Sequence, residues 1–322
     1  MAAFLVANVM RRWGLAARQI RRTRLLFSLL GGLLGGLLGG GGCANIPPPK
    51  SVPPSADHAI AVLRHDRGCG QATRATATLT LVTPTASFRG DAHLLASHPN
   101  NLRLEVQTSF GVALLQLAAA RDMAAIDVRN RVFSQGPNDA CTLHAWLGLA
   151  VPSELLVAVM RGSVPVIAHK QSALRWLGDG AWELTFEGDG FTEVVELAVP
   201  ALGHDEPWAA QSPAVRRAEL RLGSRVVWRL EEEKHAPAPR AGAFVDPDGL
   251  DDTVLPSGPE CHAALPRRVI LTLPERNASL RLDLGDVYWN PPLLASAFAL
   301  AVPDGFRKET LRCGEGPEVS LP

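Results

Sequence analysis

The five cysteines are the residues of this 322-residue chain that most readily carry covalent chemistry. Four of them follow an N-terminal leader, at Cys69, Cys141, Cys261 and Cys313. An even number in an exported chain favours two disulfides, with three possible connectivities. We expect Cys69–Cys141 and Cys261–Cys313, because each pair then lies within one half of the chain; free thiols are the alternative. No pair has CxxC spacing, and the nearby His144 and His262 complete no ligand pattern, so we expect no metal site.

Motifs for enzymatic catalysis are absent from the sequence. The nine histidines are scattered, with no HExxH, no GxSxG and no glycine-rich phosphate loop. Two Gly-Asp-Gly triplets, at 178–180 and 188–190, could present carboxylates, but each lies between expected strands, where a turn is the simpler interpretation. The aspartates of 246–252 could bind calcium, yet they lack the spaced ligands of an EF-hand loop. We therefore expect no enzyme, no catalytic residue and no cofactor, although folding could still assemble a hydrolase site.

The N-terminus has the layout of an export signal. Arginines up to position 24 precede an apolar segment at 25–38, and four glycines then lead into Cys43. This resembles the lipobox of bacterial lipoproteins, in which the signal (here 1–42, starting at Met1 or Met10) is cleaved and Cys43 acquires diacylglycerol and palmitate. An uncleaved anchor is less favourable, because eight of the 18 residues at 25–42 are glycines, which weaken a helix. Plain secretion is the third alternative. By the same resemblance, Ala44 favours the outer membrane of a Gram-negative bacterium.

Charge and composition describe the mature chain. The leader holds six of the 32 basic residues and no acidic residue, which leaves 26 basic against 32 acidic residues. This acidic balance argues against a nucleic-acid partner, since phosphate binding needs clustered Lys and Arg. Residues 43–57 are rich in proline and are expected to form an extended tether. No change of composition divides 58–313, which we expect to be one domain, followed by a tail at 314–322.

The stretch 88–162 has the most distinct pattern of secondary structure. Short apolar runs at 88–96, 102–106, 112–117, 124–128 and 131–133 are separated by Gly, Pro and Asn, which predicts an antiparallel meander. Two segments with helical spacing follow, at 141–147 and 153–161, and each stops at a glycine, Gly148 or Gly162. This order predicts a curved sheet with two apolar helices against its concave face.

The flanking segments extend this sheet. Residues 57–66 have a helical stripe with Asp57 as its cap, and 74–82 alternate as a half-buried strand. Further strands are expected at 182–186, 191–199, 218–222, 225–230, 268–273, 280–287 and 306–311, with a helical turn at 293–297. Residues 231–260 have the composition of a long loop with at most one short strand. The fold class is therefore mainly β (α+β), with about ten or eleven strands.

The order of these motifs resembles the LolA/LolB lipoprotein-carrier superfamily across about residues 72–312. The resemblance lies in the early Phe-x-Gly strand, the Ser-Phe-Gly turn at 109–111, the helix pair with Trp-Leu-Gly at 146–148, and the ending at 286–305, which contains Trp289-Asn290. It implies a strongly curved antiparallel half-barrel whose helices cover an apolar cavity for acyl chains. The expected lining residues are Leu104, Val106, Val112, Leu115, Leu117, Trp146 and Leu147; ordinary core packing is the alternative for each of them.

These observations predict a lipoprotein that is anchored to the membrane, faces the periplasm and binds a lipid or an acylated ligand without covalent chemistry. Its partners would be the membrane, through Cys43, the bound lipid or acylated protein, and an envelope protein. The alternative is a structural lipoprotein with a filled core that acts through protein contacts in an envelope complex. An apolar concavity would favour the first function, and a packed interior with an apolar outer patch the second.

Overall fold

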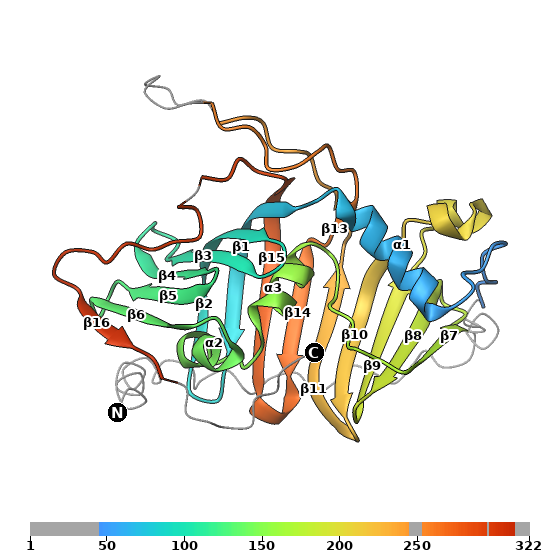
Figure 1. Ribbon diagram of the computed structural model, residues 1–322, viewed down its shortest axis with the longest axis horizontal. Coiled ribbons are helices and arrows are strands. Elements are labelled where there is room, and N and C mark those ends of the chain that lie inside the picture. The colour runs from blue at the N-terminus through green and yellow to red at the C-terminus, as the bar shows by residue number, and fades with distance from the viewer. Residues whose placement is uncertain (1–44, 245–252, 295, 313–322) are drawn as a thin grey trace, which may run out of the picture.

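One large antiparallel sheet dominates the structure, which is a computed structural model describing residues 45–244, 253–294 and 296–312. Fourteen strands follow the order β16-β6-β5-β4-β3-β2-β1-β15-β14-β11-β10-β9-β8-β7. The sheet curves without closing into a barrel, and β16 and β7 form its two edges (Figure 1). The expected half-barrel is therefore confirmed, and it has more strands than the ten or eleven predicted.

The strands of the first half form the meander predicted from the turn residues. They are β1 (Ala72–Val82), β2 (Ser87–Ser97), β3 (Asn101–Gln107), β4 (Ala113–Ala119), β5 (Asp122–Asp127) and β6 (Val132–Pro137). The second half contributes β7 (Gln171–Trp176), β8 (Ala181–Gly188), β9 (Phe191–Ala198), β10 (Ala214–Leu222), β11 (Arg225–Glu233), β14 (Arg268–Leu273) and β15 (Ala278–Trp289). The last strand, β16 (Arg307–Thr310), pairs with β6 in parallel, unlike the other strand pairs described in this sheet. A separate two-stranded ladder consists of β12 (Ala236–Pro237) and β13 (Ala264–Leu265).

The two halves of the chain meet in the middle of the sheet. β1 pairs with β2 on one side and with β15 on the other, so strands separated by about 200 residues lie side by side. Its register places Leu79 opposite Leu282 and Leu81 opposite Leu280. The apolar positions of both halves therefore point into one shared interior, as period-two alternation requires.

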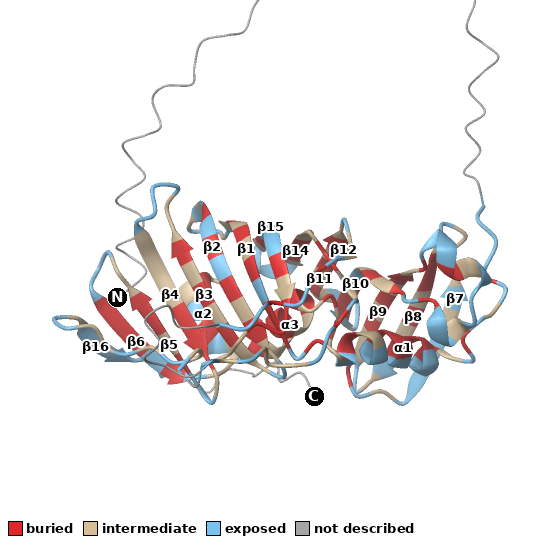
Figure 2. Ribbon diagram, turned by 90° about the horizontal axis from the view of Figure 1, so that it is seen from above, coloured by how far each residue is buried: buried red, intermediate tan, exposed pale blue. Residues whose placement is uncertain are grey.

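Three helices lie on one side of this sheet: α1 (Ala56–Gly68), α2 (Ala140–Leu147) and α3 (Ser153–Met160). Figure 2 shows α1 and α3 along this side of the sheet. Gly148 and Gly162 follow α2 and α3 with φ of 68° and 64°, as the glycine stop signals predict. Short 3₁₀ turns occur at η3 (Ala201–Asp205), η4 (Trp208–Ala210) and η5 (Pro274–Arg276).

The cap predicted for the first helix was wrong by two residues. Ser55 is the N-cap of α1, and its hydroxyl accepts a 3.3 Å hydrogen bond from the His58 backbone N–H. Asp57 instead reaches outside the helix, where its carboxylate accepts hydrogen bonds from Ser172 (2.5 Å) and His169 (2.8 Å). It therefore attaches the first turn of α1 to the segment entering β7.

The two expected disulfides, Cys69–Cys141 and Cys261–Cys313, are also wrong. Cys69 is bonded to Cys261, with their Cα atoms 5.2 Å apart. Cys141 is disulfide-bonded as well, and Cys313 lies outside the described residues. The prediction failed because it kept each bond within one half of the chain, whereas the sheet places β1 beside β15 and so brings the end of α1 to the loop before β13.

Asn290 organises the same junction. Its side-chain oxygen accepts hydrogen bonds from the backbone N–H groups of Gln71 (2.8 Å) and Ala72 (3.2 Å), and its amide nitrogen donates to the carbonyls of Cys69 (2.8 Å) and Pro259 (2.6 Å). The preceding Trp289 is fully buried and passes so close to Gly70 that a β-carbon there would overlap its ring. The Trp-Asn pair noted in the sequence therefore has a structural role: it joins the end of α1, the start of β1 and the loop before β13.

The tether is docked on the body over the part that the structure describes. The Ile46 N–H donates to the Gly178 carbonyl (2.8 Å), and the Trp176 indole N–H donates to the Ile46 carbonyl (2.8 Å). Pro49 and Pro53 are buried. Residues 46–53 thus lie along the β7 end of the sheet instead of projecting as an extended spacer.

Other expectations concern less regular segments. The predicted turn at 293–297 includes residue 295, which lies outside the described residues, and a turn follows at 296–298. The possible calcium ligands at 246–252 also lie outside them. The same holds for residues 1–44, which contain the expected signal peptide and Cys43.

Candidate functional site

An apolar cavity lies between α3 and the centre of the sheet. Its wall contains thirteen residues, all of them aliphatic or Met: Leu79, Leu81, Leu94, Leu102, Leu104, Leu147, Leu156, Val159, Met160, Val269, Leu271, Leu280 and Leu282. The cavity volume is about 30 Å³. An apolar space of this size stays dry, since a water molecule inside would lack hydrogen-bond partners.

The sheet side of the cavity is built from rows of residues that the strand register aligns. Leu79 of β1, Leu282 of β15 and Val269 of β14 form one row, and Leu81, Leu280 and Leu271 form the next. On the other side of β1, Leu94 of β2 lies opposite Leu104 of β3. Because alternate residues of a strand face the same side, these rows make a continuous apolar wall.

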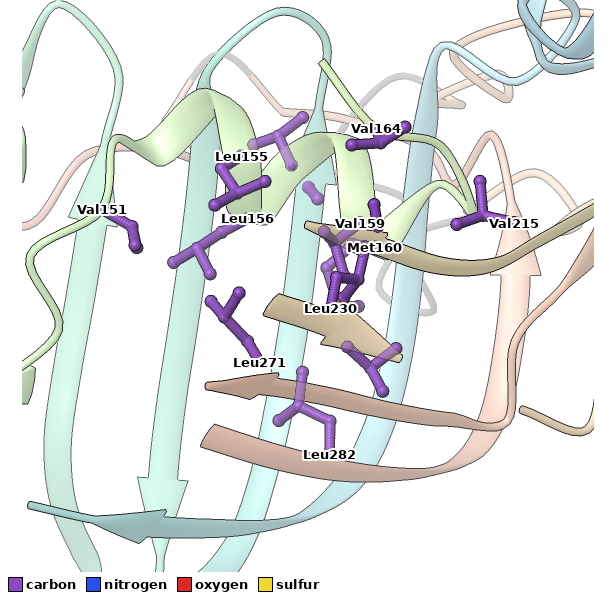
Figure 3. Close-up of a cluster of buried hydrophobic side chains, with 14 of the residues drawn as sticks. Val151, Leu155, Leu156, Val159, Met160, Val164, Val215, Leu230, Leu271 and Leu282 are labelled. Atoms are coloured by element: carbon purple, nitrogen blue, oxygen red, sulfur yellow. The ribbon is translucent and has the colours of Figure 1, made fainter. Parts of the chain in front are cut away.

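Helix α3 covers this wall. Its sequence is almost entirely apolar, and a helix that is apolar all round is expected to be buried. Leu156, Val159 and Met160 face the strands, with Leu271 and Leu282 opposite them (Figure 3). From α2, Leu147 is the residue that lines the cavity. Helices α2 and α3 therefore lie against the concave face, as predicted.

Both ends of α3 are attached by polar contacts. At the start, Glu154 accepts a 3.2 Å hydrogen bond from the side chain of Asn100 in the β2–β3 turn. At the end, Arg161 donates to the carbonyls of Gly70 (2.8 Å) and Arg67 (3.1 Å), and Arg67 donates to the Gly162 carbonyl (3.3 Å). Between these ends, the contacts described between the helix and the sheet are apolar.

The residues of the cavity wall carry no charge, but the segment after α3 crosses a buried carboxylate. The Ile167 N–H donates to Glu193 of β9 at 2.8 Å, while the second oxygen of that carboxylate is buried with no partner among the described residues. Burial raises the pKa of Glu193 to about 7, although Arg64 and His169 oppose the shift. Burial likewise raises the pKa of Glu232, against the opposing effect of His235.

The seven residues predicted to line a cavity lie in different places. Leu104 and Leu147 belong to the wall of the cavity. Val106 and Leu117 are buried elsewhere in the core, and Leu115 and Trp146 are partly buried against it. Val112 is 59% exposed, beside Phe110 at 93%, near the tip of the β3–β4 hairpin. The structure thus brings two of the seven together at this cavity.

Most of the wall was missed because the sequence prediction concentrated on residues 88–162. Leu271, Leu280 and Leu282 come from the last third of the chain, and only the pairing of β1 with β15 brings them to α3. The period-two alternation of β1 and β15 was a signal for their inward direction. It did not say which strands would be neighbours.

The polar motifs considered for chemistry have structural roles. The two Gly-Asp-Gly triplets are turns, and their aspartates pair with surface cations, Asp179 with Arg216 (2.9 Å) and Asp189 with Lys170 (3.0 Å). In the described part of the chain, no group of three or more His, Cys, Asp or Glu residues is arranged to hold a metal ion. Nor does any described helix have the length and hydropathy needed to span a bilayer.

Comparisons with known proteins find similarity at the level of fold. No protein-family model matches the chain, and no curated protein matches it. A LolA superfamily protein from Nitrosomonas europaea superposes with a TM-score of 0.42 and 11% identity, over 76% of this chain and 98% of that one. A domain from Vibrio parahaemolyticus, provisionally described as an outer membrane lipoprotein-sorting protein, gives 0.43 and 12%, over 76% and 97%.

A DUF1329 family protein from Desulfovibrio piger is similar to the same degree, with a TM-score of 0.41 and 9% identity over 76% of this chain and 97% of that one. Two of these solved structures are described in terms of the LolA superfamily or lipoprotein sorting, the class that the sequence resembles. The likeness concerns the fold alone, so the function proposed below rests on the cavity.

Proposed function

We propose that this chain is a periplasm-facing lipoprotein that binds one acyl chain of a lipid or acylated protein, without covalent chemistry, between α3 and the sheet. The observation that carries the proposal is the cavity wall, in which thirteen apolar residues from seven elements converge and no ionisable group intervenes. Such a wall can recognise hydrocarbon and little else. Attachment to the outer membrane through a diacylated Cys43 belongs to the same proposal and rests on the sequence of the leader.

The energetics are favourable only if α3 moves. A cavity of about 30 Å³ holds a small fraction of an acyl chain, whereas ligand pockets usually enclose several hundred Å³. Each buried methylene contributes about 0.8 kcal/mol, so ten of them would contribute about 8 kcal/mol, equivalent to a micromolar affinity. Displacing α3 would offset part of this gain. We therefore propose that α3 shifts away from β14 and β15 while its polar ends keep it attached.

The Met160→Ala variant tests this function. Removing most of the Met160 side chain enlarges the cavity and should lower the free energy of unfolding by about 2–5 kcal/mol. Palmitate at 100 times its Kd should then restore about 2.7 kcal/mol, measured as a rise in Tm. The matched control is Met123→Ala, because Met123 is a fully buried methionine of β5 outside the cavity wall. Because Met123→Ala keeps the cavity of the wild type, palmitate should stabilise it less than Met160→Ala, whose enlarged cavity needs a smaller displacement of α3. Equal rises in Tm at one palmitate concentration, or no rise in either variant, would contradict the proposed site.

A second function is favoured by the small volume of the cavity. If the interior stays filled, the protein would act through contacts in an envelope complex, and Phe110 with Val112 is an exposed apolar point from which to do so. In that case Phe110→Ser would remove a partner from pull-downs, and palmitate would stabilise neither this variant nor the wild type. Stabilisation of the wild type by palmitate, together with an unchanged set of partners in Phe110→Ser, would exclude this second function.

A further inference from the structure

The docked tether determines where the body sits relative to the point of anchoring. Lys50 donates its backbone N–H to the His204 carbonyl of η3 (3.0 Å). The Ser51 hydroxyl accepts a hydrogen bond from the Trp208 N–H of η4 (3.0 Å), and its carbonyl accepts one from the Gln211 side chain (2.7 Å). Together with the Ile46 contacts to β7, these bonds attach residues 46–51 to one end of the molecule, at the right in Figure 1.

Little chain separates this docked segment from Cys43. Ile46 is three residues from Cys43, and each residue of an extended chain spans at most about 3.6 Å. An acyl anchor on Cys43 therefore keeps the bilayer surface within about 11 Å of Ile46. A tether of this reach does not let the body turn freely above the membrane.

The surface beside the docked tether is apolar, and the charges next to it have one acidic residue in excess. Leu202 of η3 is 93% exposed, and Ala201, Ala209 and Ala210 are exposed around it. The charges alongside include an ion pair between Lys50 and Asp205 (2.8 Å), with Glu206 exposed nearby. We call these four apolar residues the η3–η4 surface. It offers one large apolar side chain to a layer of lipid headgroups, and the charges beside it form no positive patch that would select anionic lipid.

We propose that the η3–η4 surface rests on the bilayer that holds the acyl anchor, with Leu202 inserted among the lipid headgroups. The β7 edge of the sheet then lies next to the membrane and the β16 edge lies far from it. This inference rests on the proposed lipidation of Cys43. It adds the orientation in which the anchored body lies on the membrane. The fourteen-stranded sheet stands on one edge, and its cavity lies above the membrane surface.

Fluorescence in reconstituted vesicles tests this orientation. The full chain carrying Leu202→Cys would be produced in a bacterium that processes lipoproteins, labelled with a polarity-sensitive thiol dye, and placed in phosphatidylethanolamine–phosphatidylglycerol vesicles. We expect a blue-shifted emission that brominated lipid quenches. The matched control is Lys308→Cys, at an exposed position of β16, where neither effect is expected. The unsubstituted chain, labelled in the same way, gives the background.

A linker variant and a mass measurement separate the possible failures. Ten Gly and Ser residues inserted between Ala44 and Asn45 should reduce the dye signal at position 202 to that at position 308. A mature mass that includes diacylated Cys43, with equal signals at 202 and 308, would overturn the orientation and leave the anchor intact. A mature mass without lipid would contradict the anchor and the orientation together. Palmitate binding by the cavity is independent of either result.

Discussion

Glu193 is an ionisable residue on the buried face of β9, between Thr192 and Val194. One oxygen of its carboxylate accepts the Ile167 N–H, and the other is buried without a partner among the described residues. Burial dominates the shift and raises its pKa to about 7. The hydrogen bond from the Ile167 N–H opposes the shift most, followed by the charges of Arg64 of α1 and of His169, which precedes β7. The side chain therefore changes charge near neutral pH while it holds the segment that follows α3.

Stability should fall as pH rises through this range. The native state keeps the Glu193 proton up to about pH 7, whereas an unfolded carboxyl loses it near 4.5, so the stabilisation is fully present below 4.5 and is lost as pH rises through 7. The full effect is about 3 kcal/mol. Denaturant unfolding between pH 5 and 8 should show this decline in the wild type and a shallower one in Glu193→Gln.

The remaining decline in that variant belongs to Glu232, whose pKa burial also raises, and to His169, whose pKa is raised by its hydrogen bond to the Ile167 carbonyl. The matched control is Glu187→Gln, at an exposed position of β8. Identical pH dependence in Glu193→Gln and the wild type would show that Glu193 is ionised in the native state throughout this range, and would contradict the raised pKa.

Helix α3 is the element on which the proposed function depends. Polar contacts attach both of its ends, and its apolar middle covers the cavity. The sequence predicted this helix and its glycine stop, because local spacing and a left-handed C-terminal position are local signals. It did not predict the clamp formed by Arg161 and Arg67, because that clamp joins α3 to the end of α1, more than 90 residues away.

Breaking the clamp should loosen the helix without unfolding the sheet. Arg161→Met keeps an apolar stem and removes both hydrogen bonds to the carbonyls of Gly70 and Arg67, at a cost of about 1–3 kcal/mol. Hydrogen exchange in peptides covering 153–164 should become faster, while β1 and β15 remain protected. The control is Arg175→Met, which breaks a surface ion pair with Glu183 on β7 and β8. Unchanged exchange in α3 would mean that the apolar contacts alone hold it closed.

The architecture of the whole molecule depends on the order of the strands in the sheet, and no local sequence pattern specifies that order. Turn residues and alternation predicted the meander of 88–133 and most later strands, since each reflects nearby sequence. The mostly exposed edge strand β7 was missed, because the pattern there shows little of the alternation that marks a half-buried strand. Pairing of β1 with β15 sets the cavity wall and the Cys69–Cys261 bond, and both are contacts between distant segments. This is why two of the seven predicted lining residues reached the cavity and the disulfide prediction failed.

Native mass spectrometry of residues 44–322, produced in a bacterial periplasm, tests the central claim most directly. We expect a protein mass with an additional non-covalent component, which denaturation releases as a phospholipid or acyl chain. Leu282→Trp, which adds volume to the cavity wall opposite α3, should carry less of it, whereas Leu255→Trp at a 71% exposed position should carry as much as the wild type. A bare protein mass that also fails to take up added palmitate would contradict lipid binding and leave contacts within an envelope complex as the function.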